Sequence, residues 1–189
     1  MEWNLSYSGY SAYGNSFTYS NDMNGDGLST DLIYIPATKD EVAFSSEADR
    51  DAFWKFVEQD SYLSKHKGEY AEANAARAPF VHRFDLRVAK DIKFRIGPTS
   101  HKFQVSASID NIGNMFNSKW GVRKLDCYNK NSFTGLISPL KYDGLNASGV
   151  PTFSFNKVND TYPTETYSTY YSNTSECWQI LLGLKYFFN

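Results

Sequence analysis

Residues 178–189 read WQILLGLKYFFN and carry the clearest structural signal in this chain. Every second residue is large and apolar, namely Trp178, Ile180, Leu182, Leu184, Tyr186 and Phe188. Since a strand points alternate side chains to opposite faces, these residues form one continuous apolar face. Aromatic residues stand at both ends of the series and aliphatic residues between them, which is the order found across a bilayer. The pattern predicts a membrane-spanning β-strand whose apolar face meets lipid.

The composition favours a barrel and excludes other classes of protein. The chain has 189 residues, of which 17% are aromatic, yet its mean hydropathy is −0.51. This combination is typical of a barrel with aromatic girdles and a polar interior. No apolar run approaches the roughly 18 residues that a transmembrane helix needs, so a helical membrane protein is excluded. The net charge of −2 gives no basic surface for nucleic acid.

Three further segments alternate in the same way, at about residues 2–13, 80–96 and 102–116, and the terminal strand covers about 177–189. Lys90 interrupts the apolar face of the second segment. The opposite faces carry charged side chains that suit a water-filled lumen, namely Arg83, Asp85, Arg87, Asp91 and Asp110. These charges either line a transport path or pair with one another across strands, and charge pairing is the simpler interpretation.

The connections between these segments differ greatly in length. A short turn with Gly97 and Pro98 follows the second segment, whereas long loops span about residues 14–79 and 117–176. Short periplasmic turns and long extracellular loops are typical of outer-membrane barrels. Ser46 and Asp49 resemble a capping box, so a short helix is expected over about residues 46–62. The sequence therefore predicts an all-β fold: about four C-terminal antiparallel strands of a transmembrane β-barrel, with long extracellular loops that contain this helix.

The segment from residue 22 to residue 27 begins like a calcium-binding loop. Such a loop has oxygen-bearing side chains at alternate positions and a glycine at the sixth position. The candidate ligands are Asp22, Asn24, Asp26, Thr30 and Asp31. The twelfth position, where a bidentate carboxylate belongs, is Ile33, so the pattern is incomplete. The alternative, which we favour, is a turn rich in Asx and glycine residues that leads into a short strand.

No pattern in the sequence indicates covalent catalysis. His66, His82 and His101 lack ligand spacing, and no catalytic partner can be assigned to them. We therefore expect that the protein is not an enzyme and needs no cofactor other than the Ca²⁺ considered above. Cys127 and Cys177 match no metal or redox motif and form either one disulfide or two thiols.

Several motifs of the chain resemble segments of one known family. Four lie in the predicted loops: DMNGDG at 22–27, DLIYIP at 31–36, YLSKHKGEY at 62–70 and NAARAPF at 74–80. Four accompany the predicted strands: RFDL at 83–86, DNIGNMFN at 110–117, KWG at 119–121 and LKYFFN at 184–189. Together they resemble the C-terminal end of the Oar-like TonB-dependent receptors of Bacteroidetes. Asn189 departs from the terminal Phe common in that family, which stands one position earlier as Phe188.

The resemblance implies a barrel of roughly 22 strands occluded by an N-terminal plug, with this chain supplying the last strands. Residues 178–188 would then belong to the closing strand that the barrel assembly machinery recognises. The implied function is TonB-dependent import of a bulky nutrient across the bacterial outer membrane. The implied partners are outer-membrane lipid, the remainder of the barrel and plug, and the TonB complex, reached through an N-terminal part outside this chain.

Two alternatives compete with this interpretation. One is a secreted, soluble, β-rich module that binds carbohydrate, but it would need polar residues on the even-numbered face of the terminal strand. The other is a calcium-stabilised surface protein, which rests on the loop from Asp22 to Asp31 alone. Residues 1–5 have neither the basic region nor the apolar core of a signal peptide, so we expect the chain to be a fragment of a longer receptor.

Overall fold

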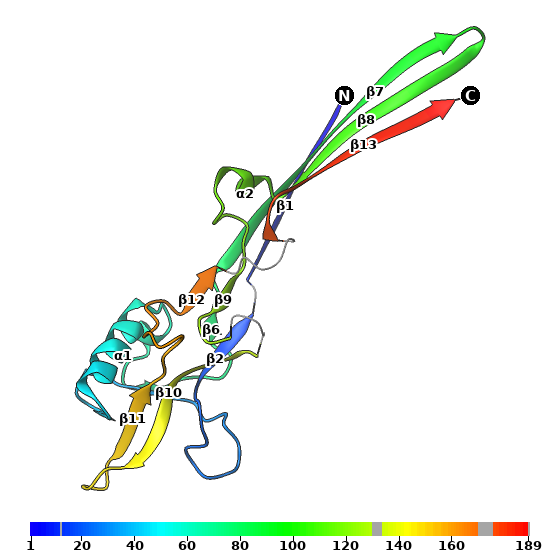
Figure 1. Cartoon of the computed structure of the whole chain (residues 1–189). Helices are drawn as coiled ribbons and strands as arrows, with labels where there is room; N and C mark the ends of the chain where they lie inside the picture. Colours follow the sequence, from blue (N-terminus) through cyan, green and yellow to red (C-terminus); the bar gives the residue numbers. More distant parts are fainter. Residues whose placement is uncertain (12, 130–133, 170–175, 189) are drawn as a thin grey trace. The chain divides into compact units, whose positions relative to one another are not determined.

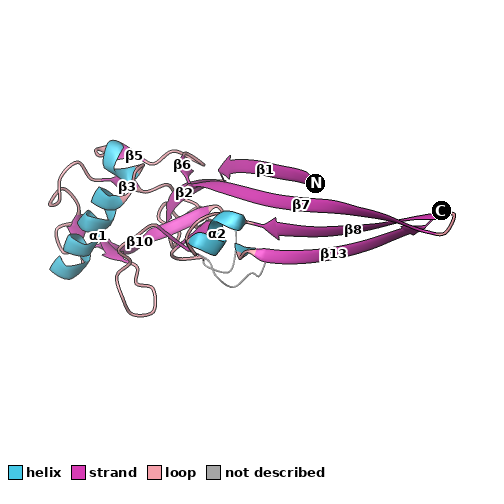
Figure 2. Ribbon diagram, turned by 90° about the horizontal axis from the view of Figure 1, so that it is seen from above, coloured by secondary structure: helices cyan, strands magenta, loops and turns pink. Residues whose placement is uncertain are grey.

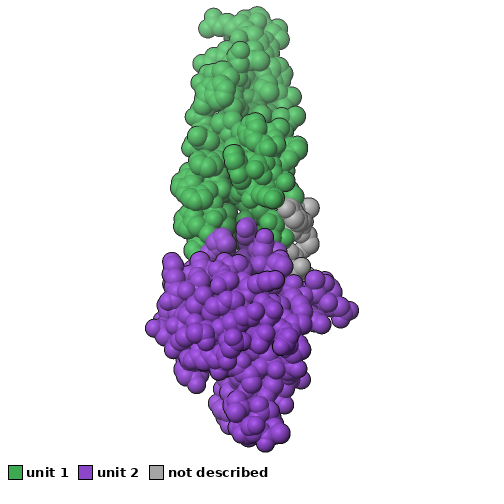
Figure 3. Space-filling view, turned by 90° about the vertical axis from the view of Figure 1, so that its left-hand side faces the viewer, with its two compact units in different colours: residues 1–11, 80–123, 169–189 green, residues 12–79, 124–168 purple. Residues whose placement is uncertain are grey.

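The computed structural model describes residues 1–11, 13–129, 134–169 and 176–188 (Figure 1). Strands make up 49% of the chain and helices 12%, in agreement with the predicted all-β class. The chain divides into two compact units (Figure 3). Unit 1 comprises residues 1–11, 80–123 and 169–189, and unit 2 comprises residues 12–79 and 124–168. No helix among the described residues is both long enough and apolar enough to cross a membrane.

Unit 1 contains a four-stranded antiparallel sheet in the order β1-β7-β8-β13 (Figure 2). The strands are β1 (Glu2–Ser11), β7 (Phe80–Ile96), β8 (Thr99–Asp110) and β13 (Gln179–Phe188). Alternating polar and apolar side chains, many of them β-branched or aromatic, favour this extended backbone. The three pairings run without a register shift, so side chains of all four strands fall into shared rows.

A two-residue turn, Gly97 and Pro98, joins β7 to β8. Gly97 has φ of 61°, a left-handed conformation that glycine adopts without steric cost. Pairing continues to the turn itself, where Ile96 lies opposite Thr99. The strand β8 therefore starts three residues before the predicted residue 102.

The predicted range 80–96 coincides with β7, but the bounds of the other predicted strands differ from those observed. The range 102–116 is wrong at its end, because β8 stops at Asp110 and a short helix, α2 (Ile112–Phe116), follows. Asn111 takes φ of 50°, which an extended strand does not allow. The first strand stops at Ser11 instead of residue 13, and Ala12 lies outside the described residues. The last starts at Gln179 instead of residue 177, and Asn189 lies outside the described residues.

Most residues of the predicted loops, at about 14–79 and 117–176, fold into unit 2, which has a sheet of its own in addition to the predicted helix. Its main sheet has the order β4-β11-β10-β2-β6. These strands are β2 (Gly14–Tyr19), β4 (Ala43–Phe44), β6 (Ala76–Arg77), β10 (Leu136–Leu145) and β11 (Pro151–Phe155). Both parallel and antiparallel pairings occur, since β10 runs parallel to β2 and antiparallel to β11. Two small pairings complete the set: β3 (Tyr34–Ile35) with β5 (Glu69–Tyr70), and β9 (Lys124–Asp126) with β12 (Tyr167–Thr169).

Unit 2 has a hydrophobic core of its own. Phe17, Ile33, Phe56 and Ile137 are at most 1% exposed, although they come from segments far apart in the sequence. Aromatic rings contact one another there: the centroids of Phe56 and Phe155 lie 5.4 Å apart. The core explains why these segments are ordered, because buried apolar area offsets the entropy of fixing the chain.

One helix of unit 2 was predicted from the sequence. The α-helix α1 (Glu47–Gln59) lies within the predicted range 46–62 and is followed by the 3-10 helix η1 (Leu63–Lys65). Ser46 is its N-cap, as the capping box indicates: the Asp49 N–H donates to Ser46 Oγ at 3.1 Å. Phe53 and other apolar side chains at helical spacing face the core.

We predict that Ser46→Ala lowers the local stability of α1 by about 1 kcal/mol, because an N–H of the first turn loses its acceptor. The measurement is amide hydrogen exchange of α1 in the whole chain. Ser61→Ala, at an exposed position after the helix, is the control and should leave exchange unchanged. Equal protection in both variants would contradict the capping role.

Candidate functional site

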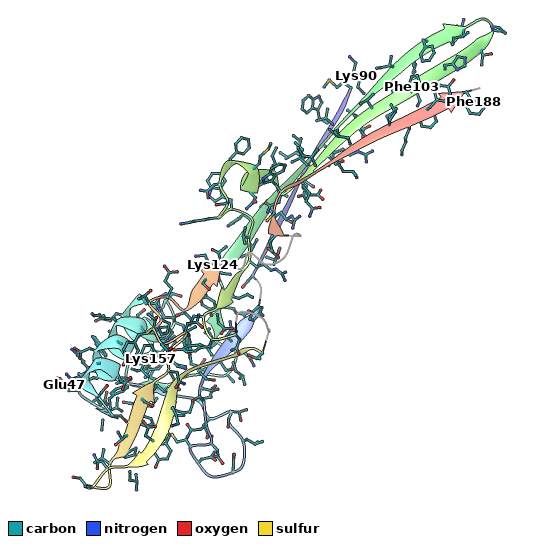
Figure 4. The ribbon with its side chains drawn as sticks, viewed as in Figure 1. Glu47, Lys90, Phe103, Lys124, Lys157 and Phe188 are labelled. Atoms are coloured by element: carbon teal, nitrogen blue, oxygen red, sulfur yellow. The ribbon has the colours of Figure 1, made fainter. Side chains whose placement is uncertain are left out.

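The strand register of unit 1 gathers apolar side chains on one face of the sheet. Leu86 lies opposite Leu5 on one side and Ile109 on the other, and Ile109 lies opposite Ile180. The same alternation runs along all four strands. The apolar face comprises Trp3, Leu5, Tyr7, Phe84, Leu86, Val88, Ile92, Phe94, Phe103, Val105, Ala107, Ile109, Ile180, Leu182, Leu184, Tyr186 and Phe188. Phe103 and Phe188 are labelled in Figure 4.

Most side chains of this face are exposed despite their size, and the others are half-buried. Leu182 is 76% exposed, Leu184 70% and Phe188 75%. Single exposed leucines are ordinary on a protein surface, but a contiguous apolar area of this extent marks contact with a membrane or a partner. Trp178 stands apart from the other predicted lipid-facing residues: it precedes β13, and its backbone N–H donates to Asn114 Oδ1 at 3.2 Å.

Aromatic rings collect at the two ends of the apolar face. Near the β7–β8 turn, the ring centroid of Phe103 lies 5.6 Å from that of Phe94 and 4.7 Å from that of Tyr186. At the other end, Tyr7 lies 5.0 Å from Phe84. The two β7 rings, Phe84 and Phe94, are separated by about 33 Å of strand at the usual rise per residue. At the tilt usual in barrels this corresponds to a band about 25 Å tall, the height of the apolar band of outer-membrane barrels.

The opposite face of the sheet, the polar face, carries the five predicted charges. Arg83, Asp85, Arg87 and Asp91 alternate along β7, and Asp110 ends β8. Arg83 Nε lies 3.4 Å from Asp85 Oδ1. Asp91 accepts hydrogen bonds from Lys102 Nζ at 3.4 Å and from Gln104 Nε2 at 3.0 Å, both on β8. These contacts agree with the simpler interpretation, in which charged side chains pair along and across strands.

Both edges of the sheet are open in the described part of the chain. The strand β1 pairs with β7 alone, and β13 pairs with β8 alone. Each edge strand has ten residues, whose outward backbone groups lack a strand partner among the described residues. Long open edges of this kind pair readily with further strands.

Two asparagines that follow β8 hold unit 1 together at one end of the sheet. Asn111 is fully buried; its N–H donates to Asp85 Oδ1 at 2.6 Å and its Nδ2 donates to the carbonyls of Gly121 and Glu176. Gly121 has φ of 63°, and a Cβ there would collide with Asn111 Oδ1. Asn114 Nδ2 bonds the carbonyl oxygens of the following turn. This asparagine clamp, Asn111 and Asn114, links α2 to β7 and to the start of β13.

A partly buried ion pair strengthens the same region. Glu176 is 4% exposed, and its carboxylate accepts the backbone N–H of Arg123 at 3.0 Å and the Arg123 Nε at 2.5 Å. The sequence analysis predicted neither this pair nor the clamp, because it assigned residues 102–116 to one continuous strand. The available signal was the repeated asparagine three residues apart directly after a strand, since asparagine side chains often bond nearby backbone.

In the segment that begins like a calcium-binding loop, carboxylates accept backbone hydrogen bonds from the loop itself. Asp22 accepts the N–H groups of Gly25 and Gly27, each at 2.7 Å, and Asp31 Oδ2 accepts the N–H of Met23 at 2.8 Å. These bonds, that from Gly27 foremost, hold the pKa of Asp22 below its ordinary value. The geometry is that of successive Asx turns, the alternative favoured from the sequence.

The other candidate calcium ligands join the same network or stand outside it. Asn24 Oδ1 accepts the Asp26 N–H at 2.9 Å, and Asn24 Nδ2 donates to Asp31 Oδ1 at 2.7 Å. Thr30 is exposed and supplies none of these acceptors. Among the described residues, no group of three or more His, Cys, Asp or Glu side chains is arranged to hold a metal ion. Cys127 is buried and Cys177 exposed, both as thiols.

Unit 2 carries two small polar hollows. One, of about 240 Å³, is lined by Gln59, Asp60, Lys124 and Tyr167 among others. The second, of about 250 Å³, is lined by Asp40, Glu47 and other residues. Lys124 and Glu47 are labelled in Figure 4. Both hollows are smaller than the usual ligand pocket, so they suit part of a ligand at most.

Comparisons of the chain with family models, with curated proteins and with solved structures found no match. The candidate site is therefore defined by its geometry: an exposed apolar face with aromatic ends, a charged opposite face and two open edges.

We predict that Asn111→Ala destabilises unit 1 by about 2–4 kcal/mol, because it leaves two buried carbonyl groups without a donor. Urea unfolding of the chain in detergent micelles, followed by tryptophan fluorescence, measures the loss. Asn117→Ala, at an exposed position just after α2, is the matched control and should cost little. If both variants unfold at the same urea concentration as the parent chain, the clamp has no structural role.

The lowered pKa of Asp22 predicts acid sensitivity of its loop. A carboxyl group whose pKa is lower in the folded loop stabilises that loop while it is ionised, above the ordinary Asp pKa of about 4. This contribution is lost as the pH falls through the lowered pKa. Cleavage of the loop by an acid-tolerant protease should therefore accelerate below about pH 4, and Asp22→Asn should cleave quickly at all pH values. A flat pH profile in the parent chain would contradict this.

Proposed function

We propose that this chain is part of the wall of a TonB-dependent receptor that imports a bulky nutrient across the bacterial outer membrane. The observation that carries the proposal is the four-stranded sheet of unit 1, whose faces differ in polarity along its length. In water, each large apolar side chain on the exposed face would lack the about 1.5–3 kcal/mol of stabilisation that full burial provides. Contact with lipid removes that cost, and the aromatic ends of the face suit the two membrane interfaces.

The polar face would line the interior of the barrel. Arg83, Asp85, Arg87 and Asp91 then meet water or the plug. The Arg83–Asp85 and Lys102–Asp91 pairs lower the cost of holding charges inside a wall. The Gly97-Pro98 turn would be periplasmic, and the segments of unit 2, which continue from the other ends of the strands, would lie outside the cell. Unit 2 would contribute part of the surface that meets the nutrient.

The two open edges support membership of a larger barrel. Unpaired backbone groups are unfavourable in lipid, where no water replaces the missing hydrogen bonds. The strands β1 and β13 would therefore each pair with a strand of the remaining wall. In this proposal the rest of the barrel, the plug and the TonB complex are partners outside this chain, and the barrel assembly machinery recognises the strand that ends at Phe188.

The proposal predicts different chemical accessibility for neighbouring residues of β13. In a Cys177→Ser background in detergent micelles, a hydrophilic maleimide should label Lys185→Cys much faster than Leu184→Cys. The reason is that position 184 faces the detergent and position 185 faces water. Labelling rates followed by mass spectrometry measure the difference.

The same pair of variants tests the alternative of a soluble binding module. After urea denaturation the cysteines introduced at positions 184 and 185 should react at the same rate, which controls for their intrinsic reactivity. Equal rates in micelles, together with a stable monomer in the absence of detergent, would overturn the membrane proposal.

A further inference from the structure

The apolar face contains a hollow of about 620 Å³. Its walls include Val88, Ile92, Val105, Leu182 and Leu184, and the small side chain of Ala107 lies between the larger ones. Ala107 pairs with Val88 on one side and Leu182 on the other, so the hollow lies across three neighbouring strands. Its volume is within the range of ligand-binding pockets, and its lining suits a hydrocarbon chain.

Lys90 is itself one of the residues that line this hollow. It lies opposite Val105 on β8, and Val105 lies opposite Leu184 on β13, so the ammonium group extends from the apolar face. The neighbouring carboxylates, Glu2 and Asp91, occupy alternate positions and belong to the polar face. Within the described part of the chain, no ion pair involves Lys90.

A cation at this place is unfavourable without a partner. Lys90 lies between the two aromatic ends, about 13 Å along the strand from Phe94. A lysine that faces lipid near mid-height destabilises the strand that carries it. Its flexible stem can lean toward the Phe94 end, where the ammonium group would come near lipid headgroups. The missing partner is therefore an anion attached to an apolar chain.

We propose that the hollow and Lys90 together bind one anionic glycerophospholipid, with an acyl chain in the hollow and its phosphate paired with the Lys90 ammonium group. The inference rests on the proposed function, because a lipid reaches this face only if the face lies in a membrane. A zwitterionic lipid carries its own cation beside the phosphate, whereas the phosphate of phosphatidylglycerol has none. The site therefore prefers the anionic lipid. Figure 4 labels Lys90 on β7.

The test uses the chain in detergent micelles. Phosphatidylglycerol with brominated acyl chains is titrated into one sample and phosphatidylcholine with the same brominated chains into another. Bromine quenches tryptophan fluorescence on contact. Trp3 is the reporter because it lies opposite Val88 on the apolar face, and Trp54, Trp120 and Trp178 are replaced by Phe. We expect phosphatidylglycerol to quench at about fivefold lower concentration, the ratio for roughly 1 kcal/mol per lysine at an anionic lipid.

Two variants assign the preference to one residue. Lys90→Gln should abolish the preference and leave quenching by both lipids intact. Lys93→Gln, on the same strand but on the polar face, should keep the preference. A preference that survives Lys90→Gln, or that disappears in Lys93→Gln, would overturn the role of Lys90.

The failure of this inference differs from the failure of the proposed function. Equal quenching of the parent chain by the two lipids would overturn the anionic site and leave the lipid-facing sheet standing. The absence of quenching by either lipid would overturn the proposed function itself, since the apolar face would then not meet lipid.

Discussion

The in-register pairing of β1, β7, β8 and β13 is the constraint on which unit 1 depends. Because side chains alternate with a period of two, a slip of one residue in any pairing would send a whole series of apolar side chains to the polar face. The continuous pairing without register shifts keeps Leu86, Ile109 and Ile180 in one row. The apolar face, the charge pairs opposite it and the hollow beside Lys90 all follow from that alignment.

The two ends of the sheet are held by different means. At one end the two-residue turn at Gly97 and Pro98 ties β7 directly to β8. At the other end the sheet has no such short connection, and the buried side chain of Asn111 bonds segments that are distant in sequence. Unit 2, in contrast, is stabilised by its own apolar core, so its order does not depend on the register of the long strands.

Much of unit 1 was predictable because its signal is local. The alternation placed β7 at its observed bounds, and it placed Ile180 to Phe188 on one face. The capping box located the start of α1 through contacts between Ser46 and Asp49, which are near in sequence. The helix α2 was missed because the strand ends at Asn111, whose side chain bonds residues as distant as Glu176. In the sheet of unit 2, β2, β4 and β6 were missed because each is short and pairs with residues distant in sequence.

The amino-acid pattern alone thus established the long strands, their two unlike faces and the turn at Gly97, since each depends on residues a few positions apart. The sequence also indicated the turn after Asp22, because its Asx and glycine residues form hydrogen bonds within the same short segment. The folded chain was needed to reveal the strand order, the register, the asparagine clamp and the core around Phe17 and Ile137. These features depend on contacts between distant residues, and no local periodicity specifies which distant residues will meet.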